Sequence, residues 1–139
     1  MKKIFLLFAM FAMFLSSFAQ ERTNYQFCYY KAGTDAEPIY YFSDLFSLRD
    51  WDINIYEIKR AFKRLLYDEG RTESIREDDI KQGILYDVTD SKAQANEFKD
   101  TIIKIDKDNF ERKQTQYPKD KRETFRSSKK TLPLYRLHE

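Results

Sequence analysis

The hydrophobic pattern of the chain after residue 24 begins with two short segments of period two. From Tyr25 to Tyr30, aromatic and other side chains alternate between two faces, which is typical of a β-strand. Ile39 to Phe42 is a second run of this kind. Residues 31–38 between them contain Gly, Asp and Pro, which favour a loop. The pattern therefore predicts two antiparallel strands joined by a long hairpin loop.

The period then changes to that of an α-helix. Apolar residues recur at three- and four-residue spacing, at Ile55, Ile58, Phe62, Leu65 and Leu66. Asn54 is a candidate N-cap, and Glu57 stands three positions later, as in a capping box. Gly70 occupies the place of a C-terminal left-handed residue. Together these signals predict a helix over 55–69.

The second half of the chain predicts a strand and another helix. Residues 71–82 are charged and indicate a surface connection, and 83–88 is a short apolar run typical of a strand. Ser91 with Gln94 offers a second capping box. The helical repeat that follows comprises Ala95, Phe98, Ile102 and Ile105. We therefore expect a helix over about 92–106, with Phe110 to Thr115 as an optional last edge strand.

This order, β-β-α-β-α with an optional final strand, predicts an α+β fold. Two amphipathic helices each need an apolar surface, and one face of a small antiparallel sheet can supply it. The expected architecture is a two-layer sandwich with both helices on one face. Residues 20–115 would form this single domain, and 116–139 a basic, flexible tail whose Leu132, Leu134, Tyr135 and Leu137 could dock its end.

The start of the chain has the three parts of a cleavable secretory signal peptide. Lys2 and Lys3 precede an apolar run over 4–15, which is too short for a membrane span of about 20 residues. Small residues suited to signal peptidase end at Ala19, which predicts cleavage between Ala19 and Gln20. We therefore expect residues 1–19 to be removed, no transmembrane segment afterwards, and export to the periplasm or the cell exterior.

Charge is divided unevenly along the remaining chain. Residues 20–110 contain 14 basic and 19 acidic residues, a net charge of −5, whereas 111–139 contain 9 basic and 4 acidic residues, a net charge of +5. The basic tail either folds back on the acidic body or contacts an anionic surface. Export argues against nucleic acid as a partner, so a protein or a cell-envelope polymer is the expected partner.

The chain has one cysteine and one histidine, which limits its chemistry. Cys28 cannot form an internal disulfide, so it is either a buried thiol or an intermolecular link. His138 is the penultimate residue, far from a fixed partner for nucleophilic catalysis. Zinc sites draw on several Cys and His ligands. We therefore expect no catalytic residues, no cofactor and no metal site.

Two acidic segments contain residue types found in calcium or catalytic sites. Residues 50–54 open like a calcium loop, but Ile55 and Ala61 stand where the EF-hand pattern needs Gly and Glu. Glu77, Asp78 and Asp79 could supply the paired carboxylates of a glycoside hydrolase. Their place in a charged connection favours a solvated loop instead.

Aromatic residues of the first two strands form the candidate contact surface. A two-layer sandwich leaves one sheet face open, and exposed tyrosines there would stack on a sugar ring or a partner protein. The residues predicted for this surface are Tyr25, Tyr29, Tyr30, Tyr40 and Tyr41.

Two resemblances accompany these patterns. The Ser-Phe-Ala-Gln junction at 17–20 and the general make-up of the chain resemble small exported proteins of Bacteroidetes-type bacteria, which implies a location. Residues 83–110, a strand and a capped helix with Ala95 and the Ile102–Ile103 pair, resemble half of a SPOR-type peptidoglycan-binding repeat. That family has a helix between its first two strands, unlike this chain, so no binding residues are carried over.

The first hypothesis is a small exported, non-enzymatic binding or interaction module. A carboxylate-dependent glycan hydrolase is one alternative. An envelope protein held to an anionic surface by its basic tail is another.

Overall fold

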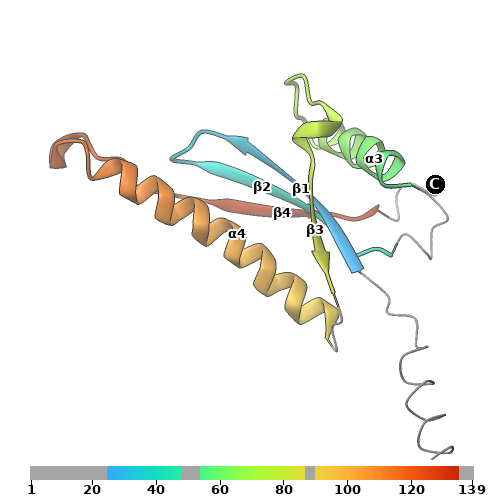
Figure 1. The fold of residues 1–139 in the computed structure, drawn as a ribbon. Helices are drawn as coiled ribbons and strands as arrows, with labels where there is room; N and C mark the ends of the chain where they lie inside the picture. Colours follow the sequence, from blue (N-terminus) through green and yellow to red (C-terminus); the bar gives the residue numbers. More distant parts are fainter. Residues whose placement is uncertain (1–24, 48–53, 87–89, 135–139) are drawn as a thin grey trace, which may run out of the picture.

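A computed structural model describes residues 25–47, 54–86 and 90–134 of the chain. These residues form a four-stranded sheet and two helices (Figure 1). In chain order the elements are β1 (Tyr25–Gly33), β2 (Pro38–Ser43), α3 (Ile55–Asp68), the 3-10 turn η1 (Glu77–Asp79), β3 (Lys81–Leu85), α4 (Ser91–Gln114), the 3-10 turn η2 (Lys119–Lys121) and β4 (Ser128–Leu132). The predicted cleavage point at Ala19 and Gln20, residues 50–53 of the calcium-like segment, and His138 lie outside the described residues.

The sheet has the strand order β3-β1-β2-β4. β1 pairs antiparallel with both β2 and β3, whereas β4 runs parallel to β2. The α+β class and the order β-β-α-β-α with a final strand are confirmed. The sheet is mixed rather than antiparallel, because the long connection through α4 returns β4 beside β2 in the same direction.

Helix α3 begins where the capping signal predicts. The Asn54 side chain accepts a 3.0 Å hydrogen bond from the backbone N–H of Glu57. Gly70 follows the helix with a φ of +96°, a left-handed conformation that glycine adopts without strain. The apolar stripe is buried through Ile58, Phe62, Leu65 and Leu66.

Helix α4 is longer than the predicted helix over 92–106. It begins after Asp90, whose carboxylate accepts the N–H of Ala93, so Asp90 rather than Ser91 is the N-cap. It continues through Phe110, and the optional strand at 110–115 is therefore wrong. Phe110 extends the helix because its ring packs on Phe125 of the returning chain, 5.7 Å between centroids. Neither helix of the described ranges is both long and apolar enough to cross a bilayer.

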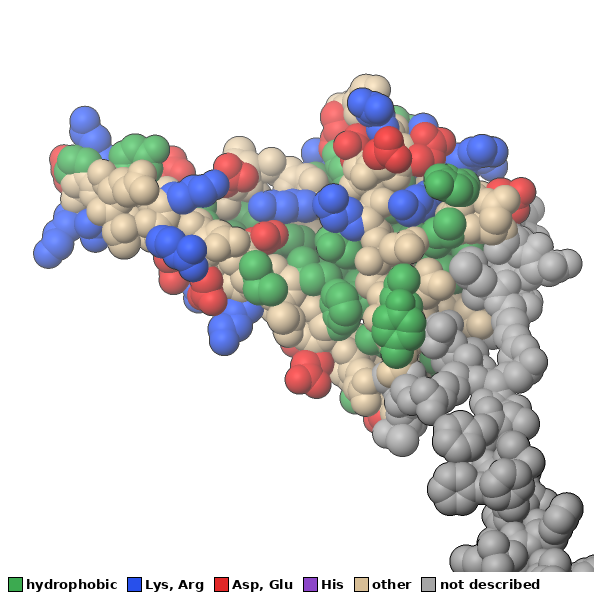
Figure 2. Space-filling model, viewed as in Figure 1, with side chains coloured by type: hydrophobic (Ala, Val, Ile, Leu, Met, Phe, Trp, Pro, Cys, Tyr) green, Lys and Arg blue, Asp and Glu red, His purple; other side chains and the backbone are tan. Residues whose placement is uncertain are grey.

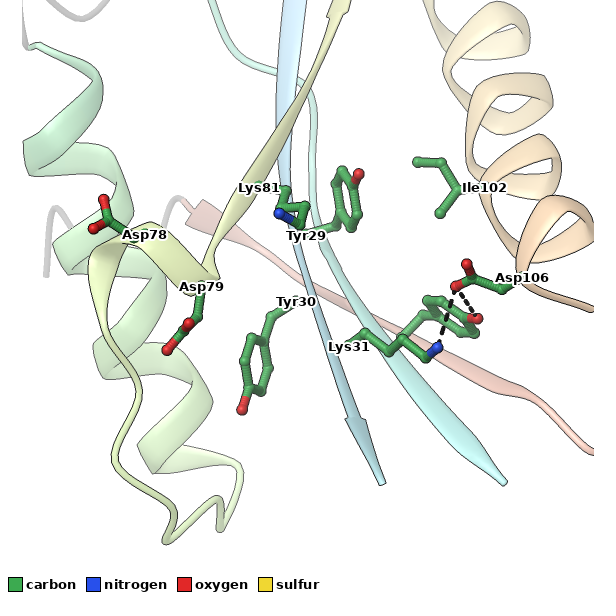
Figure 3. Close-up of a pocket in the computed structure, with 9 residues that line it drawn as sticks. Tyr29, Tyr30, Lys31, Asp78, Asp79, Lys81, Ile102 and Asp106 are labelled. Carbon is green, nitrogen blue, oxygen red and sulfur yellow. Dashed lines mark hydrogen bonds and ion pairs between the residues drawn. The ribbon is translucent and has the colours of Figure 1, made fainter. Parts of the chain in front are cut away.

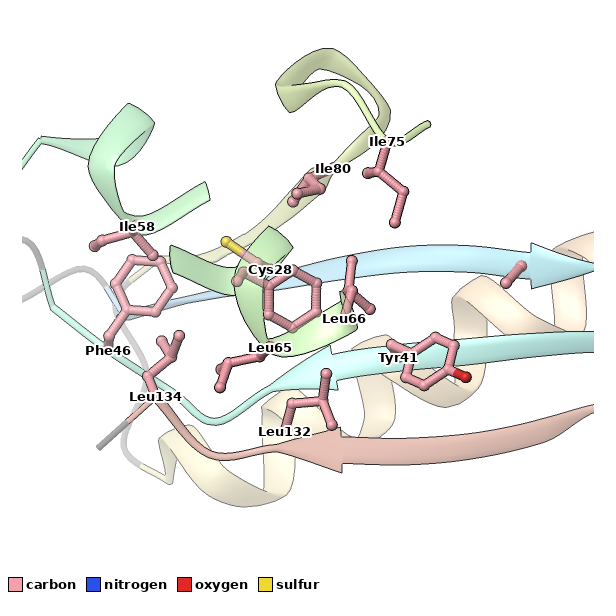
Figure 4. Packing of buried hydrophobic residues seen from close by; sticks show 12 residues of the cluster. Cys28, Tyr41, Phe46, Ile58, Leu65, Leu66, Ile75, Ile80, Leu132 and Leu134 are labelled. Atoms are coloured by element: carbon pink, nitrogen blue, oxygen red, sulfur yellow. The ribbon is translucent and has the colours of Figure 1, made fainter. Parts of the chain in front are cut away.

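The two helices cover opposite faces of the sheet, which corrects the predicted placement on one face. Cys28 and Tyr41 pack with the apolar stripe of α3 (Figure 4). Phe27 and Phe42, their neighbours in sequence, pack against Ala95 of α4 on the other side. Because successive strand residues point to opposite faces, these large side chains make both faces apolar. Each face therefore needs its own helix.

The segment predicted as a flexible tail forms β4 over 128–132. The backbone N–H of Arg126 donates to the carbonyl oxygen of Ala36 at 2.8 Å, just before the strand begins. After the strand, the N–H of Leu134 donates to the Asp44 carboxylate at 2.9 Å. Leu132 and Leu134 are buried beside α3, so the expected docking of these two residues is confirmed. Tyr135 and Leu137 lie outside the described residues.

Candidate functional site

A cavity of about 550 Å³ opens beside β1, at the point where the pairing of β1 with β3 ends. β3 pairs with β1 only from Tyr25 to Tyr29, although β1 continues to Gly33. The chain enters β3 from η1, on the side of α3, so the outer edge of β1 is left uncovered beyond Tyr29. The residues lining the cavity are Tyr29, Tyr30, Lys31, Tyr40, Asp78, Asp79, Lys81, Ile102 and Asp106.

The wall formed by α4 centres on Asp106. The hydroxyl of Tyr40 donates a 2.6 Å hydrogen bond to Oδ2 of Asp106. The ammonium nitrogen of Lys31 lies 3.5 Å from the same oxygen (Figure 3). Burial raises the pKa of Tyr40 well above its usual range, and the hydrogen bond to Asp106 adds to this shift. Burial followed by the charge of Asp106 also raises the pKa of Tyr29. The tyrosines of this wall are thus neutral hydroxyls near pH 7.

Tyr30 points to the α3 face of β1, opposite to Tyr29, and its hydroxyl is held by Glu73. Its hydroxyl donates to the Glu73 carboxylate at 3.1 Å, and the guanidinium of Arg71 holds that carboxylate at 2.8 Å. Burial, then the hydrogen bond to Glu73, raises the pKa of Tyr30 to about 12. Burial opposes ionisation of Glu73, but hydrogen bonds from Arg71, its own backbone and Tyr30 leave its pKa below the ordinary value. The ring of Tyr30 is therefore oriented before any ligand arrives.

The third wall is η1, the acidic run of the sequence. Asp79 accepts the backbone N–H of Arg76 at 2.8 Å and so closes the turn. Asp78 is exposed, 3.9 Å from the guanidinium of Arg76. Glu77 turns away toward α3, where it pairs with Arg60 and Lys63 at 3.8 Å. Figure 3 shows Asp79 and Asp106 on opposite walls, with Tyr30 and Lys31 between them.

The structure gives the five predicted contact tyrosines different positions. Tyr29 and Tyr30 line the cavity, half-buried. Tyr40 also lines it, but it is fully buried and reaches Asp106 through its hydroxyl. Tyr41 is buried under α3, and Tyr25 packs at the edge of the cluster under α4. The predicted open sheet face is therefore wrong, because each face carries a helix.

Sequence reasoning missed the charged members of the cavity. Lys31 was placed in the hairpin loop, whereas β1 continues through it to Gly33. Asp106 stands at the end of the predicted helix over 92–106, whereas α4 continues to Gln114. The spacing of Ile102 and Asp106, one helical turn apart, was the available signal that both face the same surface.

The remaining reactive groups do not add chemistry to this cavity. Cys28 is buried under α3, and desolvation raises the pKa of its thiol to about 12. Such a thiol is protonated and weakly nucleophilic near neutral pH. Among the described residues, no three Cys, His, Asp or Glu side chains are grouped to hold a metal ion. The cavity offers ordered hydroxyls, carboxylates, ammonium groups and two half-buried aromatic rings.

No family model, curated protein or solved structure matches the chain.

Proposed function

We propose that the chain is a small exported, non-enzymatic binding module and that the cavity beside β1 binds a saccharide unit of a cell-envelope polymer. The observation that carries this proposal is the placement of Tyr29 and Tyr30 beside side chains of both charges. A sugar presents apolar C–H faces that stack on aromatic rings and hydroxyls that both donate and accept hydrogen bonds. The lining supplies both kinds of partner within one cavity.

The charged groups suit this ligand. Lys31 and Lys81 can donate hydrogen bonds, and Asp78 and Asp79 can accept them. A volume of about 550 Å³ falls within the range of small-molecule pockets, roughly 300–1,000 Å³. The rings are also held in place by Glu73 and by the β-sheet, which lowers the entropy cost of ordering them on binding.

Hydrolysis is the competing function because carboxyl groups stand on two walls of the cavity, Asp79 on η1 and Asp106 on α4. A glycoside hydrolase needs one carboxyl group that donates a proton and a second that attacks or activates water. Oδ2 of Asp106 accepts the hydroxyl of Tyr40 and forms an ion pair with Lys31. Asp79 holds the turn through the N–H of Arg76. These structural contacts favour binding over hydrolysis.

The binding test is a titration of the ¹⁵N-labelled protein with soluble peptidoglycan fragments and, in parallel, with neutral glucan oligosaccharides. We expect a saccharide to shift the amide signals of residues 29–31 and 102–106. Tyr30→Ala should weaken binding about fivefold, since an aromatic stacking contact contributes about 1 kcal/mol. Tyr56→Ala is the matched control, because Tyr56 is exposed on α3 and does not line the cavity. Shifts confined to other surfaces would contradict the proposal.

The same mixtures separate binding from hydrolysis. After prolonged incubation the saccharides are assayed for new reducing ends, with Asp106→Asn as the comparison. A binding module leaves the saccharides intact. Release of reducing ends by the parent protein, lost in Asp106→Asn, would establish the hydrolase instead.

Export is tested on the protein recovered from the periplasm and the medium of a producing bacterium. We expect its first residue to be Gln20. Recovery of the full chain beginning at Met1 would contradict cleavage after Ala19.

A further inference from the structure

The two edges of the sheet are protected unequally. The order β3-β1-β2-β4 places β3 at one edge and β4 at the other. An exposed edge strand offers unpaired backbone groups to another strand, and lysines on the edge discourage such pairing. β4 contains Lys129 and Lys130, whereas Lys81 is the single charged residue of β3. Within residues 25–47, 54–86 and 90–134, the edge at β3 is therefore the one open to pairing.

An apolar groove of about 430 Å³ lies next to this open edge. Leu85 at the end of β3 and Phe98, Ile102 and Ile105 of α4 form its apolar lining. Phe98 and Ile105 are 37% and 55% exposed, which is high for large apolar side chains. Figure 2 shows hydrophobic side chains gathered over α4 and the end of β3. Glu97 is the one charged residue that lines the groove.

A second copy of the chain can both pair with the open β3 edge and cover the apolar groove. Antiparallel pairing of two β3 strands about Gly83 sets Lys81 of each copy opposite Leu85 of the other. Lys81 and Leu85 project to the α4 face, because they pair with Tyr29 and Tyr25 on the same face as Phe27. Lys81 of one copy would then arrive at the groove of the other, beside Glu97.

We propose that the protein forms a symmetric dimer through its β3 edges, in which each groove receives the other copy. The dyad passes near Gly83, and the two sheets continue into one sheet of eight strands. Both α4 helices lie on the same side of this sheet, so Phe98 and Ile105 of the two copies are covered at once. The pairing of Lys81 with Glu97 fixes the register. Lys81 also lines the cavity beside β1, so the dimer is tested on the protein without saccharide and its outcome is separate from that of the saccharide proposal.

The first test measures the mass of the purified protein by sedimentation equilibrium over a range of concentrations. A reversible monomer–dimer equilibrium is expected. Ile105→Glu should raise the dimer dissociation constant at least about tenfold, because it places a charge on the covered apolar surface. Tyr56→Glu is the matched control, since Tyr56 is 61% exposed on α3, away from β3. A protein that stays monomeric at every concentration would overturn the proposal and leave a foreign extended peptide as the occupant of the groove.

Charge reversal tests the register. Lys81→Glu and Glu97→Lys should each weaken the dimer several-fold, and the double variant should recover it. Cysteine pairing provides an independent readout, because the same register sets Gln82 of one copy opposite Ile84 of the other. A mixture of Gln82→Cys and Ile84→Cys proteins should form mixed disulfide dimers faster than either protein alone, while the buried Cys28 stays unreactive. A dimer that is indifferent to the charge reversals and to the cysteine positions would use another surface and would contradict the proposal.

Discussion

The hydroxyl of Tyr40 and the carboxylate of Asp106 join β2 to α4 through a 2.6 Å hydrogen bond. The two residues are 66 positions apart in the chain. Tyr40 is fully buried, and its phenol needs a partner within the protein because water does not reach it. Asp106 supplies that partner and is itself balanced by Lys31. This contact fixes α4 over the sheet and sets one wall of the cavity.

Tyr40→Phe should lower the free energy of unfolding by about 1.5–3 kcal/mol, the range for a hydrogen bond to a charged group. Because the aromatic ring is retained, packing is preserved, and the loss of unfolding free energy measures the contribution of the hydroxyl group. Urea denaturation monitored by circular dichroism gives the difference in unfolding free energy between the two proteins. Tyr56→Phe, at an exposed position, should leave the midpoint unchanged. Equal stability of the Tyr40→Phe and parent proteins would show that the bond to Asp106 contributes nothing net.

Gly83 is required by the ring of Phe27. A Cβ atom at position 83 would clash with the end of the Phe27 ring, which is fully buried and cannot move aside freely. Gly83→Ala should therefore destabilise the protein by about 1–3 kcal/mol through overpacking. Thermal unfolding measures the loss. Gln82→Ala is the neighbouring control, because Gln82 is exposed on the same strand.

A second substitution tests the cause of that loss. Phe27→Leu removes the atoms that the new Cβ would meet. In the Phe27→Leu background, Gly83→Ala should cost less than in the parent protein, a non-additivity measured by the double-mutant cycle. Strictly additive costs would mean that backbone preference, rather than the ring, explains the glycine.

Alkaline pH should destabilise the fold through Cys28 and Tyr30. Burial raises the pKa of Cys28 from 9.0 to about 12, and burial with the Glu73 contact raises that of Tyr30 from 10.0 to about 12. Between about pH 9 and 12 the unfolded chain loses these protons and the folded chain keeps them. The unfolded state then binds fewer protons, so stability falls as pH rises.

Urea denaturation midpoints measured at intervals from pH 8 to 11 give the slope of stability against pH. Cys28→Ala should reduce it, because one of the groups whose pKa is raised by burial is removed. Stability that is constant over this interval in the parent protein would contradict the raised pKa of the thiol. As a separate readout, a thiol reagent should label native Cys28 far more slowly than the unfolded chain.

The sequence predicted the elements that carry a complete local signal. The helix beginning after Asn54 and the two aromatic strands are confirmed, since capping and periodicity act within a few residues. The end of α4 was missed because Phe110 is covered by Phe125, a contact that forms only when the chain turns back. A single sequence contains no local signal for that return.

The placement of the helices failed for a related reason. Aromatic residues at successive positions, such as Tyr40, Tyr41 and Phe42, were interpreted as one buried and one open face. In the structure both faces are buried, and the same side chains require a helix on each side. Tyr29, Tyr30 and Tyr40, three of the five tyrosines predicted for a contact surface, line the cavity. Lys31 was missed because β1 is longer than predicted, and Asp106 joins the tyrosines only through the tertiary contact of α4 with the sheet.

The final prediction concerns the basic end of the chain and the hypothesis that it binds an anionic surface. Removing everything after Gln116 deletes β4 together with Leu132 and Leu134, which are buried beside α3. Leu134→Ala alone should cost about 2–5 kcal/mol, measured by urea denaturation, because it leaves a cavity in the core. The truncated chain should therefore unfold, and its loss of binding would be uninformative.

Lys119→Gln with Lys121→Gln changes two exposed charges of η2 and leaves β4 in place. If the basic end binds anionic vesicles, this variant should bind them less at low salt with an unchanged urea midpoint, whereas undiminished binding would exclude η2 as the contact.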